Sequence, residues 1–111
     1  MTSIDPSDFE KLDIRSGTIF RVEEFPEARN PSYKIWIDFG TEIGMKKTSA
    51  QITKLYSMED LMGKQVLAVV NFTPKQIANF MSECLVLGLS TESGVVLIEP
   101  DTKVLNGIRL S

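Results

Sequence analysis

Short runs rich in β-branched and other apolar residues constrain the fold of this chain more than any other feature. Glycine, proline or clusters of polar residues separate the runs. Runs of this length, with partial alternation of apolar and polar residues, are typical of β-strands. We therefore predict five principal strands, followed by two shorter apolar segments at 95–98 and 108–110; the five lie at residues 14–22, 33–40, 45–52, 65–70 and 84–89.

Two segments have helical character. At residues 5–12, Asp5 is placed to cap a helix, Pro6 suits its first position, and acidic residues fill the first turn. Residues 53–63 space their apolar side chains as a helix does, with Ser57 able to cap a second turn and Gly63 at the end. Gly17, inside the first strand, predicts a bend or bulge there.

The order of these elements indicates a particular architecture. Five strands with one short helix between the third and the fourth is the order of the OB-fold, a small Greek-key barrel. Other small β barrels share the same spacing of strands. We predict an all-β fold with short helices, formed by one domain over residues 1–111: a five-stranded Greek-key OB barrel with an N-terminal helix and a C-terminal extension.

Residue composition excludes several kinds of chemistry. The 111 residues contain no histidine and one cysteine, Cys84, so no Ser-His or Cys-His nucleophile and no His-ligated zinc site can be assembled. A lone cysteine cannot form an intramolecular disulfide, and a buried, inert Cys84 is the simpler interpretation. No apolar run approaches the roughly 20 residues of a membrane-spanning helix. We expect a cytoplasmic protein without membrane insertion.

Carboxylates give no stronger indication of catalysis. Their spacing suggests neither a catalytic pair nor a hard-metal loop, and solvated or capping roles suit them better; the residues considered are Asp13, Asp38, Glu42, Glu83 and Asp101. Gly40 and Gly44 lack the spacing of a phosphate-binding loop. We expect no enzymatic activity, no metal and no cofactor.

Charge is distributed unevenly along the chain. The total is −3, but residues 1–28 sum to −4, residues 29–82 to +3 and residues 83–111 to −2. A basic central region lets one face meet a polyanion even in an acidic protein, because binding follows the local potential. The alternative is that these charges only keep the protein soluble.

The connection from residue 71 to residue 83 is the longest polar-edged one, and such connections often carry binding groups. Its apolar residues predict an adaptable groove for unfolded peptide, in which Asn71, with Ser49 and Gln51, satisfies peptide backbone groups; the groove residues are Phe72, Ile77, Phe80 and Met81. These side chains could equally close the end of the barrel.

A nucleic-acid interpretation uses overlapping residues. Lysines would contact phosphates, and short polar side chains would bind splayed bases or sugars. The predicted residues are Lys46, Lys47, Lys54 and Lys75 for phosphates, and Ser49, Gln51, Asn71 and Ser82 for bases or sugars. Trp36 is more simply interpreted as a core or interface residue than as a stacking platform.

Several segments resemble a known family. Residues 13–19, Asp-Ile-Arg-Ser-Gly-Thr-Ile, resemble the opening signature of the tRNA-binding OB domain appended to several aminoacyl-tRNA synthetases. Later segments resemble that family's further motifs, at residues 37–40, 49–53, 69–72 and 82–88. Within this family, residues 9–15, 23–29 and 37–44 are similar to free-standing CsaA-type chaperones related to protein export.

This resemblance implies a homodimer that binds peptide or tRNA on the barrel. Phe9 and Leu12 give the short N-terminal helix one apolar side, which must pack on the core or on a second copy. The resemblance assigns the interface to this helix and the C-terminal segment, hence to Phe9, Leu12, Ile108 and Leu110. We predict a chaperone that binds unfolded preproteins or peptides to assist translocation, with the export machinery as a further partner. The alternative function is that of a structure-specific tRNA-binding protein.

Overall fold

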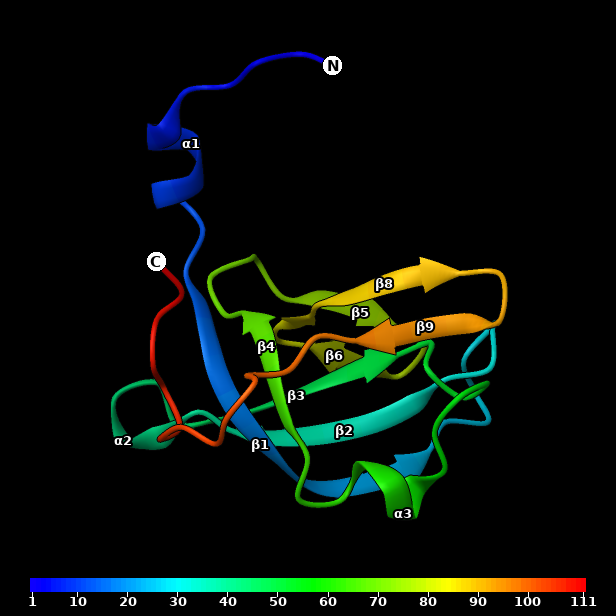
Figure 1. The fold of residues 1–111 in the computed structure, drawn as a ribbon. Coiled ribbons are helices and arrows are strands. Elements are labelled where there is room, and N and C mark those ends of the chain that lie inside the picture. Colours follow the sequence, from blue (N-terminus) through cyan, green and yellow to red (C-terminus); the bar gives the residue numbers. More distant parts are fainter.

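Five antiparallel strands form one sheet that curls into a nearly closed barrel (Figure 1). The computed structural model describes all 111 residues. The order of strands across the sheet is β3-β2-β1-β4-β7. Their bounds are β1 Ile14–Glu24, β2 Tyr33–Asp38, β3 Met45–Ala50, β4 Gln65–Val69 and β7 Leu85–Val86. The prediction of a mostly β, OB-type barrel is confirmed, with a helix between the third and fourth strands of the sheet.

Strand β1 organises the barrel because it pairs with two neighbours. Its first half pairs with β4 and its second half with β2, and Thr18 has a partner in both strands. The register of the β1–β2 pairing shifts between Ile19 and Arg21, which places the bulge at Phe20. The bulge predicted at Gly17 is therefore wrong in position.

Gly17 serves close packing instead. A Cβ atom at this position would lie 2.6 Å from Ile37 Cγ2 and 2.7 Å from Phe39 Cδ1. Both of those side chains are fully buried, and they belong to a core that also includes Ile19 and Ile35. Only glycine lets β1 approach this core so closely.

The helices are shorter than the sequence predicts. Helix α1 spans Pro6–Glu10, but the Asp5 side chain makes no capping hydrogen bond. Helix α3 covers only Met58–Leu61, where Ser57 and Asp60 form a reciprocal capping box. The predicted capping role of Ser57 is confirmed, whereas residues 53–57 precede the helix. A further single-turn helix, α2 Gly40–Ile43, connects β2 to β3.

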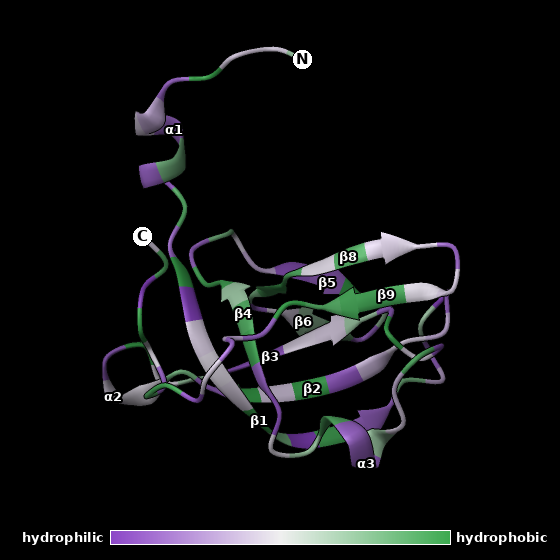
Figure 2. Ribbon diagram, viewed as in Figure 1, coloured by the Kyte–Doolittle hydropathy of each residue, from purple (hydrophilic) through white to green (hydrophobic).

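Two hairpins lie outside the five-stranded sheet. The polar connection contains the first, formed by β5 Lys75–Ile77 and β6 Phe80–Ser82. The second consists of β8 Gly88–Thr91 and β9 Gly94–Leu97. In Figure 2, hydrophobic residues are most evident along β4 and β9.

One predicted strand, residues 84–89, is divided in two. Only Leu85 and Val86 pair with β4 as the strand β7. At Leu87 the N–H still donates to Leu67 in β4, but the carbonyl accepts from Ile98, beyond β9. Gly88 then fits where a Cβ would lie 2.5 Å from Val95 Cγ1. The predicted C-terminal strand at 108–110 is reduced to a single bridge between Arg15 and Arg109.

Helix α1 stands clear of the barrel, and the C-terminal segment runs beside the beginning of β1 (Figure 1). A clasp of charged residues connects them. Arg15 donates to Asp13 Oδ1 at 2.6 Å and to the carbonyl of Gly107 at 2.9 Å, and Arg109 donates to the carbonyl of Glu10 at 2.9 Å. The clasp, defined as Asp13, Arg15 and Arg109, fixes both chain ends at the same edge of the barrel.

Asp13→Asn is expected to remove the pH dependence that this clasp gives to stability. The hydrogen bond from Arg15 is the main cause that lowers the pKa of Asp13 below its ordinary value. A carboxylate with a lowered pKa stabilises the fold above pH about 4, and this contribution is lost as the pH falls through the folded-state pKa. Urea unfolding of the variant should therefore show lower stability at pH 7 and a smaller further loss between pH 5 and pH 2.

Asp8→Asn provides the control, since the Asp8 side chain pairs only with the exposed Lys11, which follows α1. Exposed pairs of this kind contribute little to stability. Identical pH profiles for the wild type and Asp13→Asn would contradict the role given to the clasp.

Candidate binding cleft and cationic face

A cleft of about 790 Å³ opens along the side of the barrel between β3 and β7. Residues 48–52 form one wall and residues 82–88 the other. The loop before β2, the β5–β6 hairpin and the β8–β9 hairpin complete the rim through Arg29, Lys75, Ile77, Ser90 and Val95. The floor consists of core residues, because Ile52, Cys84 and Leu97 also line the cleft.

Six residues predicted from the sequence come together around this cleft. Phe72 and Ile77 supply apolar surface, and the other four are polar; these are Ser49, Gln51, Lys75 and Ser82. Ser49 and Ser82 already contact one another, because the Ser49 N–H donates to Ser82 Oγ at 3.0 Å. Leu85, half exposed on the opposite wall, is an apolar lining residue that the sequence prediction missed.

Three other predicted groove residues lie elsewhere. Phe80 is 7% exposed and packs edge-to-face on Phe25 and Trp36, at centroid distances of 5.5 and 5.8 Å. Met81 is exposed beside Gln76 and does not line the cleft, since neighbours along a hairpin strand point to opposite faces. The direct groove contacts predicted for Phe80 and Met81 do not fit these positions.

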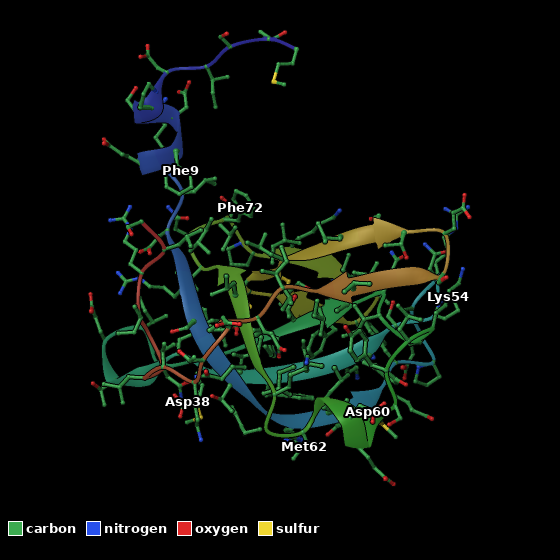
Figure 3. The ribbon with its side chains drawn as sticks, in the orientation of Figure 1. Phe9, Asp38, Lys54, Asp60, Met62 and Phe72 are labelled. Carbon is green, nitrogen blue, oxygen red and sulfur yellow. The ribbon has the colours of Figure 1, made fainter.

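Asn71 is the third predicted groove residue that lies elsewhere. Both polar atoms of its side-chain amide are used in hydrogen bonds within the chain. Its Oδ1 accepts from the N–H of Asp13 at 2.9 Å, and its Nδ2 donates to the carbonyl of Lys11 at 2.9 Å. The side chain thus holds the segment between α1 and β1 against the end of β4. Phe72 follows it and lies at the same end of the molecule as Phe9 (Figure 3).

The lysines predicted to contact phosphates do not form one cluster. Lys75 is on the rim of the cleft, whereas Lys46 and Lys47 lie on β3 and do not line it. Lys54 projects from the turn after β3, at the end of the molecule away from Phe72 (Figure 3).

A second surface, which we call the cationic face, covers the outside of β1, β2 and β3. Arg21 stacks on Trp36 at 4.4 Å from the ring centroid, and Lys34 lies 4.9 Å from Phe25. Lys34 and Lys47 also lie over Phe80, at 5.3 and 5.1 Å. The cationic face thus consists of three cations and three aromatic rings: Arg21, Lys34, Lys47, Phe25, Trp36 and Phe80.

Trp36 is half-buried there, as an outer-face residue rather than part of the main core. The alternation of β2 contains the signal for this face, because Lys34 and Trp36 alternate with the fully buried Ile35 and Ile37. The positions of Phe25 and Phe80 carry no such signal, because they reach the face from a loop and from a three-residue strand.

The one cysteine of the chain, Cys84, lines the cleft and is buried. Burial raises the pKa of the Cys84 thiol to about 12, so the thiol is protonated at neutral pH. No group of three or more His, Cys, Asp or Glu side chains is placed to hold a metal ion. None of the helices is long and apolar enough to cross a membrane.

The predicted interface residues are available for contact. Helix α1 buries none of its residues against the barrel. Phe9 is 42% exposed, Ile108 and Leu110 are exposed on the C-terminal segment, and Leu12 is half-buried.

An OB-type barrel with an open cleft and a cationic face defines a class of ligand-binding module. A family model described as "Putative tRNA binding domain" matches residues 14–109, and the chain belongs to this family. It is 33% identical over 103 residues to a methionine–tRNA ligase of Thermococcus onnurineus. The match covers 93% of the chain but only 14% of that ligase, so the chain corresponds to a small part of such enzymes.

Solved structures of free-standing proteins match more closely. A crystal structure of the chaperone CsaA from Bacillus anthracis shares 50% identity with a TM-score of 0.93, covering 99% of this chain and 100% of that one. The CsaA chaperone protein from Picrophilus torridus also shares 50% identity, with a TM-score of 0.94 and coverage of 98% and 100%. The fold is therefore that of these structures over nearly the whole of this chain.

Proposed function

We propose that this protein is a non-enzymatic chaperone that binds unfolded polypeptide segments in the cleft between β3 and β7. The observation that carries the proposal is an open cleft with a largely apolar lining, to which half-exposed Phe72 and Leu85 both contribute. Apolar side chains that remain exposed at the mouth of a cleft gain free energy when a ligand covers them.

The chemistry of the lining fits a client of variable sequence. Apolar side chains accept any client residue of suitable size, and neighbouring hydroxyl and amide groups can satisfy the client's backbone; these are Ser49, Gln51 and Ser82. A binding site of this composition discriminates weakly among sequences, as a chaperone must.

The similarity to two CsaA chaperone structures supports this assignment. We extend it to the role predicted from the sequence: binding unfolded preproteins in the cytoplasm, assisting their translocation and delivering them to the export machinery.

A second candidate function, tRNA binding, is favoured by the cationic face. Arg21, Lys34 and Lys47 can neutralise phosphates, and half-buried Trp36 is the one ring of the face with exposed surface on which an unpaired base can stack. Strands 2 and 3 of OB-folds carry nucleic-acid sites in many proteins. Membership of the tRNA-binding domain family and similarity to the methionine–tRNA ligase support this function as well.

We also propose a homodimer, formed through α1 and the C-terminal segment. A five-residue helix has no stability of its own in water. Since α1 buries nothing on its own barrel, a second copy that covers Phe9, Leu12, Ile108 and Leu110 supplies the missing packing. Dimerisation also presents two clefts to one client, which raises avidity.

Leu85→Ala tests the cleft as the peptide site. Truncation of this side chain is expected to weaken binding of an unfolded client by about 1–2 kcal/mol, or roughly 5–30-fold, because apolar surface at the mouth is removed. Fluorescence anisotropy with a labelled unfolded preprotein measures the affinity, and suppression of client aggregation measures the activity.

Leu89→Ala is the matched control. Leu89 is 59% exposed and Leu85 is 50% exposed, but only Leu85 lines the cleft. Equal effects of the two substitutions would refute the cleft as the binding site.

Lys34→Gln combined with Lys47→Gln tests tRNA binding at the cationic face. Affinity should fall at low salt, and the slope of log K against log salt should decrease by about 0.7–0.9 for each phosphate that the variant no longer neutralises. Filter binding across a salt series measures both. The charge-matched control is Lys11→Gln with Lys103→Gln, two exposed positions away from the face; if this control lowered the slope as much, net charge alone would explain the binding.

Phe9→Ser tests the homodimer. Dimer dissociation is expected to become at least tenfold easier, because burying one phenylalanine contributes about 1.5–3 kcal/mol. Light scattering coupled to size-exclusion chromatography measures the mass over a dilution series. Phe20→Ser, at a position 40% exposed on β1 against 42% for Phe9, should leave the mass unchanged; a dimer unaffected by Phe9→Ser would contradict this interface.

A further inference from the structure

The two walls of the cleft are strand edges rather than strand faces. Residues 48–52 line the cleft consecutively, and so do residues 82–88. A strand that presented one face would contribute only every second residue, because successive side chains point to opposite sides. In agreement with this, β3 and β7 are the two outermost strands of the five-stranded sheet. The cleft is the seam where the barrel does not close.

At one end, hydrogen bonds close the seam. The Glu83 N–H donates to the carbonyl of Lys47 at 2.8 Å, and the Lys47 N–H donates to Glu83 Oε1 at 3.0 Å. Next along β3, the Ser49 N–H donates to Ser82 Oγ. The side chains of Glu83 and Ser82 therefore accept hydrogen bonds from β3 that the backbone of a paired strand would otherwise accept.

Alternation along β3 identifies the next free groups. Odd-numbered residues direct their N–H groups into the seam, as Lys47 and Ser49 do, while even-numbered residues face β2. Gln51 is the next odd-numbered residue. It lies beyond the last β2–β3 pair, Tyr33 with Ala50, and its backbone N–H and carbonyl have no hydrogen-bond partner in the chain.

The opposite wall is also open. Strand β7 pairs with β4 along one edge only, through Leu85 with Val69 and Val86 with Ala68. Leu87 turns its backbone groups toward Leu67 and Ile98, away from β3. Nothing in the chain pairs with β3 beyond Ser49 on this side.

We infer that an unfolded client segment binds in extended conformation as an added strand in this seam, with its backbone hydrogen-bonded to Gln51 at the edge of β3. This inference rests on the proposed peptide-binding function and specifies how the same cleft works. Adding a strand to an exposed sheet edge takes affinity from main-chain hydrogen bonds, which every client sequence can make.

An added strand also predicts a pattern in the client. Alternate client residues would face the buried floor at Ile52, Cys84 and Leu97, and the residues between them would face solvent. Proline, which lacks an N–H, would be excluded from positions that pair with β3.

An N-methyl scan of a client peptide tests this on the unmodified protein. The probe is a fluorescein-labelled nine-residue peptide of alternating valine and serine with a terminal lysine, methylated at one backbone nitrogen at a time. The expected result is a loss of affinity of at least tenfold at the client nitrogen that pairs with Gln51, and of no more than twofold at the nitrogens on either side of it. Small, uniform effects at every position would overturn the added strand.

The unmethylated probe and an unfolded preprotein are measured first. If both bind and no single methylated position stands out from its neighbours, the added strand is refuted and the peptide-binding function stands. If neither binds, the proposed function itself fails, and this inference with it.

Gln51→Pro tests the same hydrogen bond from the side of the protein. Removal of the Gln51 N–H should lower probe affinity at least tenfold, whereas Gln51→Ala, which keeps the backbone, should lower it no more than about threefold. Equal losses in the two variants would overturn the inference. A change in oligomeric mass without a change in probe affinity would also overturn it, since a second copy would then occupy the seam. Should Gln51→Pro fail to fold, the N-methyl scan decides.

Discussion

The unequal length of its two edge strands is the constraint from which the rest of this structure follows. Strand β1 curls the sheet by pairing along its length with β2 and β4, so that β3 and β7 approach each other. Strand β3 has six residues, but β7 has only two, and Leu87 after it bonds both to Leu67 in β4 and to Ile98, the residue that follows β9. A two-residue strand cannot pair with the whole edge of a six-residue strand. The barrel closes at Lys47 and Glu83 and stays open beyond Ser49, and the cleft is the result.

The family signature at the start of β1 has a structural explanation rather than a ligand-binding one. Asp13 and Arg15 pair with each other and, through Gly107 and Arg109, with the C-terminal segment. Asn71 adds two hydrogen bonds to the same region. Together these contacts anchor the segment that follows α1 at this edge of the barrel, while α1 itself has no buried residue. The signature therefore supports a binding surface by positioning its neighbours.

Sequence periodicity predicted those elements that are long or carry a local signal, such as β1, β2 and the Ser57 cap. It missed the β5–β6 hairpin because three-residue strands are too short to show a period. It also treated residues 84–89 as one strand. The strand ends because the backbone of Leu87 bonds to both Leu67 and Ile98, and these partners are distant in the chain. Of the predicted site residues, Ser49, Gln51 and Ser82 lie together at the seam. Phe80 instead packs on Phe25 and Trp36, a contact between distant parts of the chain that no local pattern reveals.

The β5–β6 hairpin connects the two candidate surfaces physically. Lys75, Ile77 and Ser82 line the cleft, while Phe80 from the same hairpin packs in the cationic face. Truncation of a buried phenylalanine typically costs about 3–5 kcal/mol. Removing Phe80 would therefore displace the hairpin and disturb both surfaces at once, whichever ligand each one binds. A loss of peptide or tRNA binding in such a variant would report the anchoring of the hairpin, so only exposed positions on each surface can separate the two functions.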